Sequence, residues 1–121
     1  MLRPVSAVTL SFPAEAEFLR LARLAAADAA SRAGFDVDDI DDVRIAVSEL
    51  CGALSASSRI TLTLAAHEGR LEVTGTGDTS VAPQLDGLTR TVVRGVVSSY
   101  ELTAEPVGRF SFVKEAHEPI T

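Results

Sequence analysis

The sequence predicts an α+β domain, a two-layer sandwich in which three helices pack on one face of a mostly antiparallel sheet. Two pairs of alternating apolar and polar segments flank turn signals and predict hairpins, while three segments carry apolar residues at helical spacing. Hairpins and helices in this order favour helices on one side of an antiparallel sheet. The 121 residues, 46% of them hydrophobic, suffice for one core, so we expect a single domain over residues 1–121.

The chain begins with a strand and a long helix. Residues 5–12 largely alternate apolar and polar side chains, and Pro13 ends that strand and suits the first turn of a helix. Residues 14–33 form helices readily and repeat apolar residues, many of them alanine, at helical spacing. Gly34 is a suitable C-terminal stop for this helix.

The second helix begins in a run of aspartates and carries the clearest apolar stripe. The run contains Asp36, Asp38, Asp39, Asp41 and Asp42. Because unpaired N–H groups give a helix N-terminus partial positive charge, we interpret the run as a cap, with a metal or basic-partner site as the alternative. The stripe recurs at steps of three and four: Ile40, Val43, Val47, Leu50 and Leu54.

The first predicted hairpin lies in the middle of the chain. Residues 59–65 and 70–74 alternate apolar and polar side chains, and residues 67–70 form the turn between them. A loop follows from Gly75 to Pro83. The inward residues of these strands should face the stripe of the second helix.

A third helix and a second hairpin complete the predicted domain. Residues 84–98 place leucines and valines at helical spacing. Residues 100–104 and 108–113 form the last two strands, and we expect the tail over 115–121 to fray.

Composition excludes several classes of function. The net charge of −6 disfavours a nucleic-acid groove or an anionic membrane surface as the binding partner. The single cysteine, Cys51, excludes an internal disulfide and a multi-cysteine zinc site. No apolar run is long enough to cross a bilayer, and residues 1–4 lack the apolar stretch of a secretory signal. We therefore expect a cytoplasmic protein.

Common catalytic motifs are missing from the sequence. It contains no nucleophile elbow, no Walker-type phosphate loop and no His-Glu-x-x-His motif. His67 and His117 are interpreted as solvated surface residues, and Cys51 as a buried, inert thiol.

The segment Ala46-Val47-Ser48-Glu49 in the second helix resembles the first nucleotide-site helix of the GHKL (histidine kinase-like) ATPases. Among these it is most similar to the small anti-sigma factor serine kinases of bacterial stress response and sporulation. The resemblance implies a Bergerat-type fold and a Glu49 that acts as catalytic base or orienting carboxylate. Our alternative interpretation is that Glu49 is a partly exposed helix carboxylate paired with a neighbouring arginine.

The magnesium ligand of the family is missing. The resemblance implies an Asn four residues after the Glu, on the same helix face, where it holds Mg²⁺. This chain has Ala53 there, which offers no side-chain oxygen to a hard cation, and Ser57 where the family often has a His.

The adenine motif is also altered. The strand containing Leu71-Glu72-Val73 matches the one that leads into the family's Asp-x-Gly motif, whose Asp accepts a hydrogen bond from adenine. Gly77 matches the family glycine, but Gly75 stands in the place of the Asp. Asp78 is the nearest carboxylate, three residues out of register.

The lid of the family site is shortened. Gly87-Leu88 resembles the second glycine box, and only eight residues, 79–86, occupy the interval that carries the family's ATP lid. The candidate nucleotide-site residues are therefore Glu49, Gly77, Asp78 and Gly87, with no metal ligand assigned.

These features together favour an anti-sigma-factor-like regulatory protein that acts by protein binding, with a degenerate or lost ATP site. The resemblance implies a sigma factor or an anti-sigma antagonist as partner, without direct nucleic-acid or membrane binding, and leaves a homodimer open. We expect no cofactor, although ATP with Mg²⁺ stays an alternative. Whether the chain is an enzyme also stays open.

Two further functions remain as alternatives. One is an active ATP-dependent serine kinase, in which Glu49 activates a serine hydroxyl on the antagonist. The other is a structural or dimerisation module without nucleotide. For the preferred function, we expect the regulatory surface on the first two helices, partly acidic because of residues 36–42.

Overall fold

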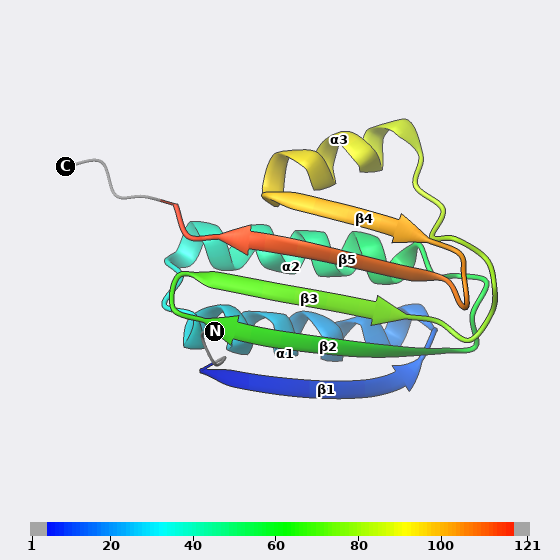
Figure 1. Cartoon of the computed structure of the whole chain (residues 1–121), viewed down its shortest axis with the longest axis horizontal. Coiled ribbons are helices and arrows are strands. Elements are labelled where there is room, and N and C mark those ends of the chain that lie inside the picture. Colours follow the sequence, from blue (N-terminus) through cyan, green and yellow to red (C-terminus); the bar gives the residue numbers. More distant parts are fainter. Residues whose placement is uncertain (1–4, 118–121) are drawn as a thin grey trace.

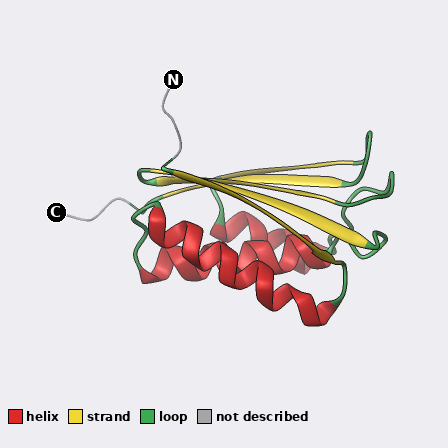
Figure 2. Ribbon diagram, turned by 90° about the horizontal axis from the view of Figure 1, so that it is seen from below, coloured by secondary structure: helices red, strands yellow, loops and turns green. Residues whose placement is uncertain are grey.

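Two layers make up the computed structural model, which describes residues 5–117. Three helices lie on one face of a five-stranded sheet of order β1-β2-β3-β5-β4 (Figures 1 and 2). Every neighbouring pair of strands is antiparallel, so the predicted α+β sandwich is confirmed. The elements are β1 (Ser6–Pro13), a 3₁₀ turn η1 (Ala16–Phe18), α1 (Leu19–Arg32), α2 (Val37–Gly52), β2 (Arg59–His67), β3 (Arg70–Thr76), α3 (Gly87–Val96), β4 (Ser99–Thr103) and β5 (Arg109–Glu115).

Helix α1 starts later than its sequence pattern predicts. Pro13 is still part of β1, where it pairs with Arg59, and it does not enter a helical turn. Glu15 is extended and η1 intervenes before the regular helix begins at Leu19. The other end is as predicted, because Gly34 has φ +83°, a conformation that suits glycine and stops the helix.

The start of α2 confirms that Asp36 caps the helix, but Asp39 does not act as an exposed charge in the first turn as predicted. The Asp36 side chain accepts a hydrogen bond from the backbone N–H of Asp39 at 2.9 Å. Asp39 itself is only 3% exposed, so it is no solvated carboxylate of the first turn. Lys114 contacts it from β5, with Nζ 3.6 Å from Asp39 Oδ1 and 2.9 Å from Asp42 Oδ2.

The core lies between α2 and the sheet, as the apolar patterns predict. Val43, Val47 and Leu50 are fully buried, and Leu54 is 2% exposed. Ile40, by contrast, is only partly buried at the edge of the core. The sheet contributes the buried side chains of Ile60, Leu62, Leu64, Leu71, Val73, Phe110 and Phe112. Alanines of α1 let it pack closely on α2: Ala22, Ala26, Ala29 and Ala30 are all buried.

The hairpin of β2 and β3 turns at Gly69, which has φ +73°. Strand β3 continues to Thr76, so Gly75 is not the start of the loop that its sequence suggests. Gly75 pairs with Leu62 on one side and Phe110 on the other, and this double pairing extends the strand.

Helix α3 is shorter than predicted. Asp86 caps it by accepting a hydrogen bond from the N–H of Thr89 at 2.7 Å, so the residues before Gly87 are outside the helix. Val97 is extended, and the Ser98 N–H donates to the Val113 carbonyl at 2.9 Å, which draws the chain into the sheet.

The expected fraying of the tail is wrong for residues 115–117. Glu115 ends β5, and the Ala116 N–H donates to the Gly69 carbonyl at 2.8 Å. The His117 N–H donates to Asp39 Oδ2 at 2.8 Å. The remaining predicted tail, 118–121, lies outside the described residues.

Candidate functional site

A hollow lies where the resemblance places the nucleotide, between the C-terminal half of α2 and the start of α3. It has a volume of about 290 Å³ and includes the exposed side chain of Glu49. Its lining consists of Ser48, Glu49, Gly52, Ala53, Gln84, Leu85 and Thr89. The structure therefore brings the candidate Glu49 beside the position that the resemblance assigns to a magnesium ligand.

Glu49 stands on the ridge between this hollow and a second one on the outer face of the helices. The second hollow has a volume of about 410 Å³ and is lined by Arg23, Asp41, Arg44, Ile45, Ser48 and Glu49. Although two arginines share this hollow, Glu49 forms no ion pair within the described chain, where Arg44 pairs with Asp41 at 3.5 Å. The interpretation of Glu49 as an arginine-paired carboxylate is therefore not supported.

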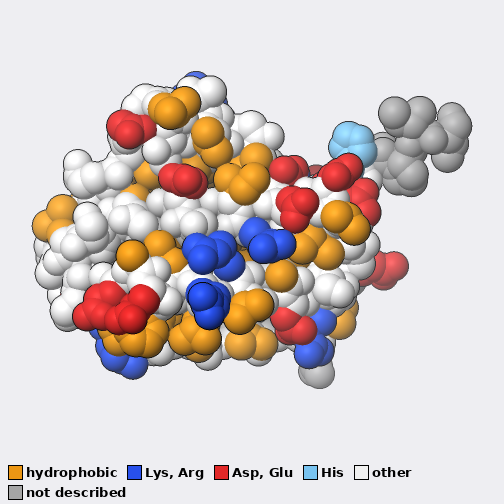
Figure 3. Space-filling model, turned by 180° about the vertical axis from the view of Figure 1, so that it is seen from behind, with side chains coloured by type: hydrophobic (Ala, Val, Ile, Leu, Met, Phe, Trp, Pro, Cys, Tyr) orange, Lys and Arg blue, Asp and Glu red, His pale blue; other side chains and the backbone are white. Residues whose placement is uncertain are grey.

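Figure 3 views the molecule from the side of the helices. Basic side chains gather near the centre of this face, and acidic ones lie mainly toward its edges. Arg23 donates to Ser48 Oγ at 3.3 Å across the junction of α1 and α2. The face that we expect to carry the regulatory surface is therefore mixed in charge.

Ala53 offers the first hollow a methyl group and no oxygen from its side chain. It follows the last residue of α2 and is 8% exposed. Its backbone is already engaged, because its N–H donates to the Glu49 carbonyl and its carbonyl accepts from the Gln84 N–H, both at 3.1 Å. Within residues 5–117, no three His, Cys, Asp or Glu side chains are grouped so that they could hold a metal ion.

The position assigned to the adenine-recognising carboxylate is closed by an aromatic ring. Gly75 is buried in β3, and a β-carbon added to it would overlap the Phe110 ring. Phe110 comes from β5, is fully buried and pairs directly with Gly75 in the sheet. A carboxylate could not occupy this position unless the ring moved.

Gly77 and Asp78 bind the loop that follows α2 and do not line the hollow beside Glu49. A β-carbon on Gly77 would overlap Ser57 Oγ, and the Gly77 N–H donates to the Gly108 carbonyl at 2.8 Å. Ser57 Oγ accepts from the Asp78 N–H at 3.0 Å. The Asp78 carboxylate accepts from the Ser58 hydroxyl and, at 2.9 Å, from the Ser58 N–H.

The contacts with Ser58 have an electrostatic consequence. Hydrogen bonds from the Ser58 hydroxyl and backbone N–H stabilise the ionised carboxylate and lower the pKa of Asp78. This aspartate therefore serves the loop as a hydrogen-bond acceptor. Gly87 lies apart from it, as the first residue of α3, with open space around its α-carbon.

The shortened interval before α3 is fastened to the turn between β4 and β5. The Gly108 N–H donates to the Thr79 carbonyl at 2.6 Å, and Ser80 Oγ donates to the Pro106 carbonyl at 3.0 Å. A β-carbon on Gly108 would overlap the Val81 carbonyl, so the two segments are in close contact. The sequence pattern shows that this segment is short but gives no sign of its attachment.

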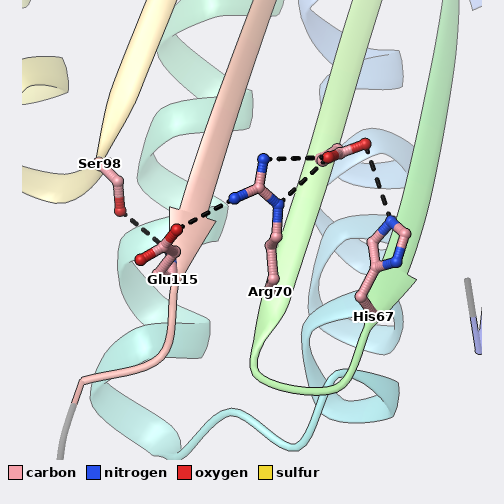
Figure 4. A network of polar contacts seen from close by, with 5 residues as sticks. His67, Arg70, Ser98 and Glu115 are labelled. Carbon is pink, nitrogen blue, oxygen red and sulfur yellow. Dashed lines mark hydrogen bonds and ion pairs between the residues drawn. The ribbon is translucent and has the colours of Figure 1, made fainter. Parts of the chain in front are cut away.

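Cys51 and His67 are two further residues whose environments are predicted from the sequence. Burial raises the pKa of Cys51 to about 12, which fits an inert thiol. His67 differs from its prediction, since its side chain is only 18% exposed and its Nε2 lies 3.7 Å from Glu72 Oε2. Arg70 connects Glu72 to Glu115 in the same network, which joins three strands at one end of the sheet (Figure 4).

The layout of sheet and helices, with an Ala-Val-Ser-Glu helix beside a hollow, is consistent with the histidine kinase-like sandwich fold. No family model matches the chain. It is similar to proteins named serine-protein kinase RsbW, which confirms the resemblance seen in α2.

Three relatives from Bacillus show the extent of the similarity. The protein of Bacillus cereus strain ATCC 10987 is 33% identical over 98 residues, which cover 76% of this chain and 61% of that protein. The protein of Bacillus cereus strain B4264 is 34% identical over 79 residues, covering 60% and 49%. The protein of Bacillus thuringiensis strain Al Hakam is 32% identical over 98 residues, covering 76% and 61%. The chain thus spans about half to three fifths of these relatives. In residues 5–117 no helix is long and apolar enough to cross a membrane.

Proposed function

We propose that this chain is an anti-sigma-factor-like regulatory protein that acts by binding other proteins, with a degenerate nucleotide site. The observation that supports this most directly is the Phe110 ring beside Gly75. It fills the place where the resemblance requires a carboxylate that reads adenine. The chain is similar to proteins named serine-protein kinase RsbW, while the altered site favours binding without phosphoryl transfer.

The other two changes affect the phosphate end of the site. Phosphoryl transfer depends on positioning and on Mg²⁺, and the Ala53 methyl stands where the resemblance places an oxygen ligand. The short 79–86 segment is hydrogen-bonded to the turn before β5, which leaves little chain to close over a ligand. The loss of a ligand and of a cover removes charge neutralisation and water exclusion.

Calorimetric titration with Mg-ATP and Mg-ADP tests the loss of the nucleotide site. We expect no binding at micromolar concentrations, and a micromolar or tighter Kd for either nucleotide would overturn the proposal. Ala53→Asn serves as the companion variant. It restores an amide oxygen but leaves Phe110 and the short segment in place, so we expect it to bind no better.

The proposed partner is a sigma factor or an anti-sigma antagonist, and the complex forms in the cytoplasm. The chain binds this partner as a single domain, either as a monomer or as a homodimer. The exposed aspartates at the start of α2 would speed the encounter with a basic surface. Asp38 and Asp41 are the positions for charge reversal, because Asp39 is buried. With an identified partner, Asp38→Lys and Asp41→Lys should lower the association rate and flatten its salt dependence. Association that ignores both changes would place the interface elsewhere.

A serine kinase remains the second candidate, and the position of Glu49 favours it. The carboxylate is exposed beside a hollow of about 290 Å³, where a catalytic base would be accessible. Transfer of labelled phosphate from ATP to a serine of an antagonist protein, abolished by Glu49→Gln, would establish this activity.

A further inference from the structure

A groove between α3 and the edge strand β4 adjoins the hollow beside Glu49, with which it shares Gln84 and Leu85. We propose that it binds an extended, acidic segment of a partner polypeptide. The groove has a volume of about 640 Å³, and α3 runs alongside β4 in Figure 1. Its lining consists of Ala82, Pro83, Gln84, Leu85, Arg90, Arg94, Tyr100 and Leu102. The inference rests on the proposed function only in that the chain acts by binding protein.

The charge of the groove comes from two arginines on α3. Arg90 and Arg94 are both exposed and lie one helical turn apart. Among residues 5–117, neither has a carboxylate oxygen within 4.0 Å, although the chain has 17 acidic residues and 11 basic ones. Guanidinium groups bind carboxylates through two parallel hydrogen bonds, so the groove is complementary to an acidic ligand.

The other wall of the groove is the outer edge of the sheet. Strand β4 pairs with β5 alone, and residues 99–103 make no further backbone hydrogen bond within the described chain. An edge strand of this kind offers unpaired N–H and C=O groups to an added strand. Tyr100 and Leu102 are half-buried on the side that lines the groove, where they add apolar contact area.

The spacing of the arginines agrees with the spacing along a strand. Side chains on one face of an added strand recur every second residue, about 6.7 Å apart. Side chains four residues apart on a helix lie about 6 Å apart. Two acidic residues separated by one other residue can therefore each meet one of the two arginines. This match favours an extended segment over a helical one.

Fluorescence anisotropy with a labelled eight-residue peptide of alternating Asp and Val, blocked at both ends, tests the inference on the full chain. We expect saturable binding that weakens at least tenfold in the Arg90→Gln/Arg94→Gln variant and falls with added salt. Arg109→Gln is the matched control and should bind as the unmodified chain does, because Arg109 does not line the groove. A peptide of alternating Lys and Val should not bind.

Hydrogen exchange locates the peptide, and bound peptide should slow exchange of the backbone amides of residues 99–103. Equal binding by the double variant, no binding by the unmodified chain, or no protection of β4 would each overturn the inference. So would a change of oligomeric state in the double variant without peptide, because the groove would then bind a second copy. Nucleotide titration tests a different ligand, and Arg90, Arg94 and β4 do not line the hollow beside Glu49, so either result can fail without the other.

Discussion

The ring of Phe110 in β5 lies against Gly75 in β3, at a position where the two residues pair directly across the sheet. Both residues are buried, and a β-carbon on Gly75 would overlap the ring. An aromatic side chain that covers a strand glycine replaces the packing that the glycine lacks. The contact thus stabilises the sheet at the position where the family resemblance implies an adenine-binding carboxylate.

Gly75→Ala tests this contact. The new methyl group must displace the Phe110 ring from a filled core, so we expect the free energy of unfolding to fall by about 1–3 kcal/mol. Urea unfolding followed by circular dichroism measures the change.

Gly95→Ala is the matched control for that substitution. Gly95 lies in α3 with open space around its α-carbon, and alanine there should stabilise the chain by about 0.5–1 kcal/mol. If the Gly75 variant were as stable as the control, the ring would move without cost and the site would not be closed.

Leu50 and Glu49 are neighbours in α2 with opposite environments. Leu50 is fully buried against the sheet, and Leu50→Ala should cost roughly 2–5 kcal/mol of unfolding free energy. Glu49 is exposed, and Glu49→Ala should cost less than about 1 kcal/mol. The same urea measurement compares them. Equal losses would mean that Glu49 is a structural carboxylate and would remove it as a candidate catalytic group.

The fold could be predicted from periodicity because its core obeys simple patterns. The α2 stripe and the alternating strands both become buried faces, so element type and inward residues follow from spacing. The ends of the helices and strands depend on tertiary contacts, which the spacing of apolar residues in the sequence does not reveal. Gly75 belongs to a strand because two neighbours pair with it, and Ser98 leaves the helix because its N–H bonds to Val113.

The candidate site was harder to predict, because its changes involve residues far apart in the sequence. The sequence shows which family residues are replaced, at Ala53 and Gly75, but not what fills their place. Phe110 reaches Gly75 only through the register of β3 with β5. Asp39 is likewise buried beside Lys114, 75 positions along the chain, at 3.6 Å, and local residue spacing does not reveal that contact.

Asp39 should stabilise the fold more than the exposed Asp38 of the same acidic run. Its carboxylate contacts Lys114 and accepts from the His117 N–H, and its side chain is only 5% exposed. Asp39→Ala leaves that N–H and part of the Lys114 charge without a partner, so we expect a loss of roughly 1–3 kcal/mol. The exposed Asp38→Ala, which loses only a favourable helix-end charge, should cost about 0.3–1 kcal/mol. Thermal or urea unfolding that ranks the two variants in reverse would contradict this assignment.

The Asp78 carboxyl should titrate at lower pH than an ordinary aspartate. The Ser58 hydroxyl and then its N–H stabilise the ionised form, so the folded pKa of Asp78 lies below the ordinary value for an aspartate. A depressed folded pKa means that this stabilisation is fully present above the unfolded pKa and is lost as the pH falls through the folded one. NMR titration of the carboxyl carbons should show that the pKa of Asp78 is higher in Ser58→Ala than in the unmodified chain. Asp86, whose pKa is lowered by the N–H of Thr89, is the internal control and should titrate unchanged. An Asp78 midpoint that does not respond to Ser58→Ala would show that this hydrogen bond is not its cause.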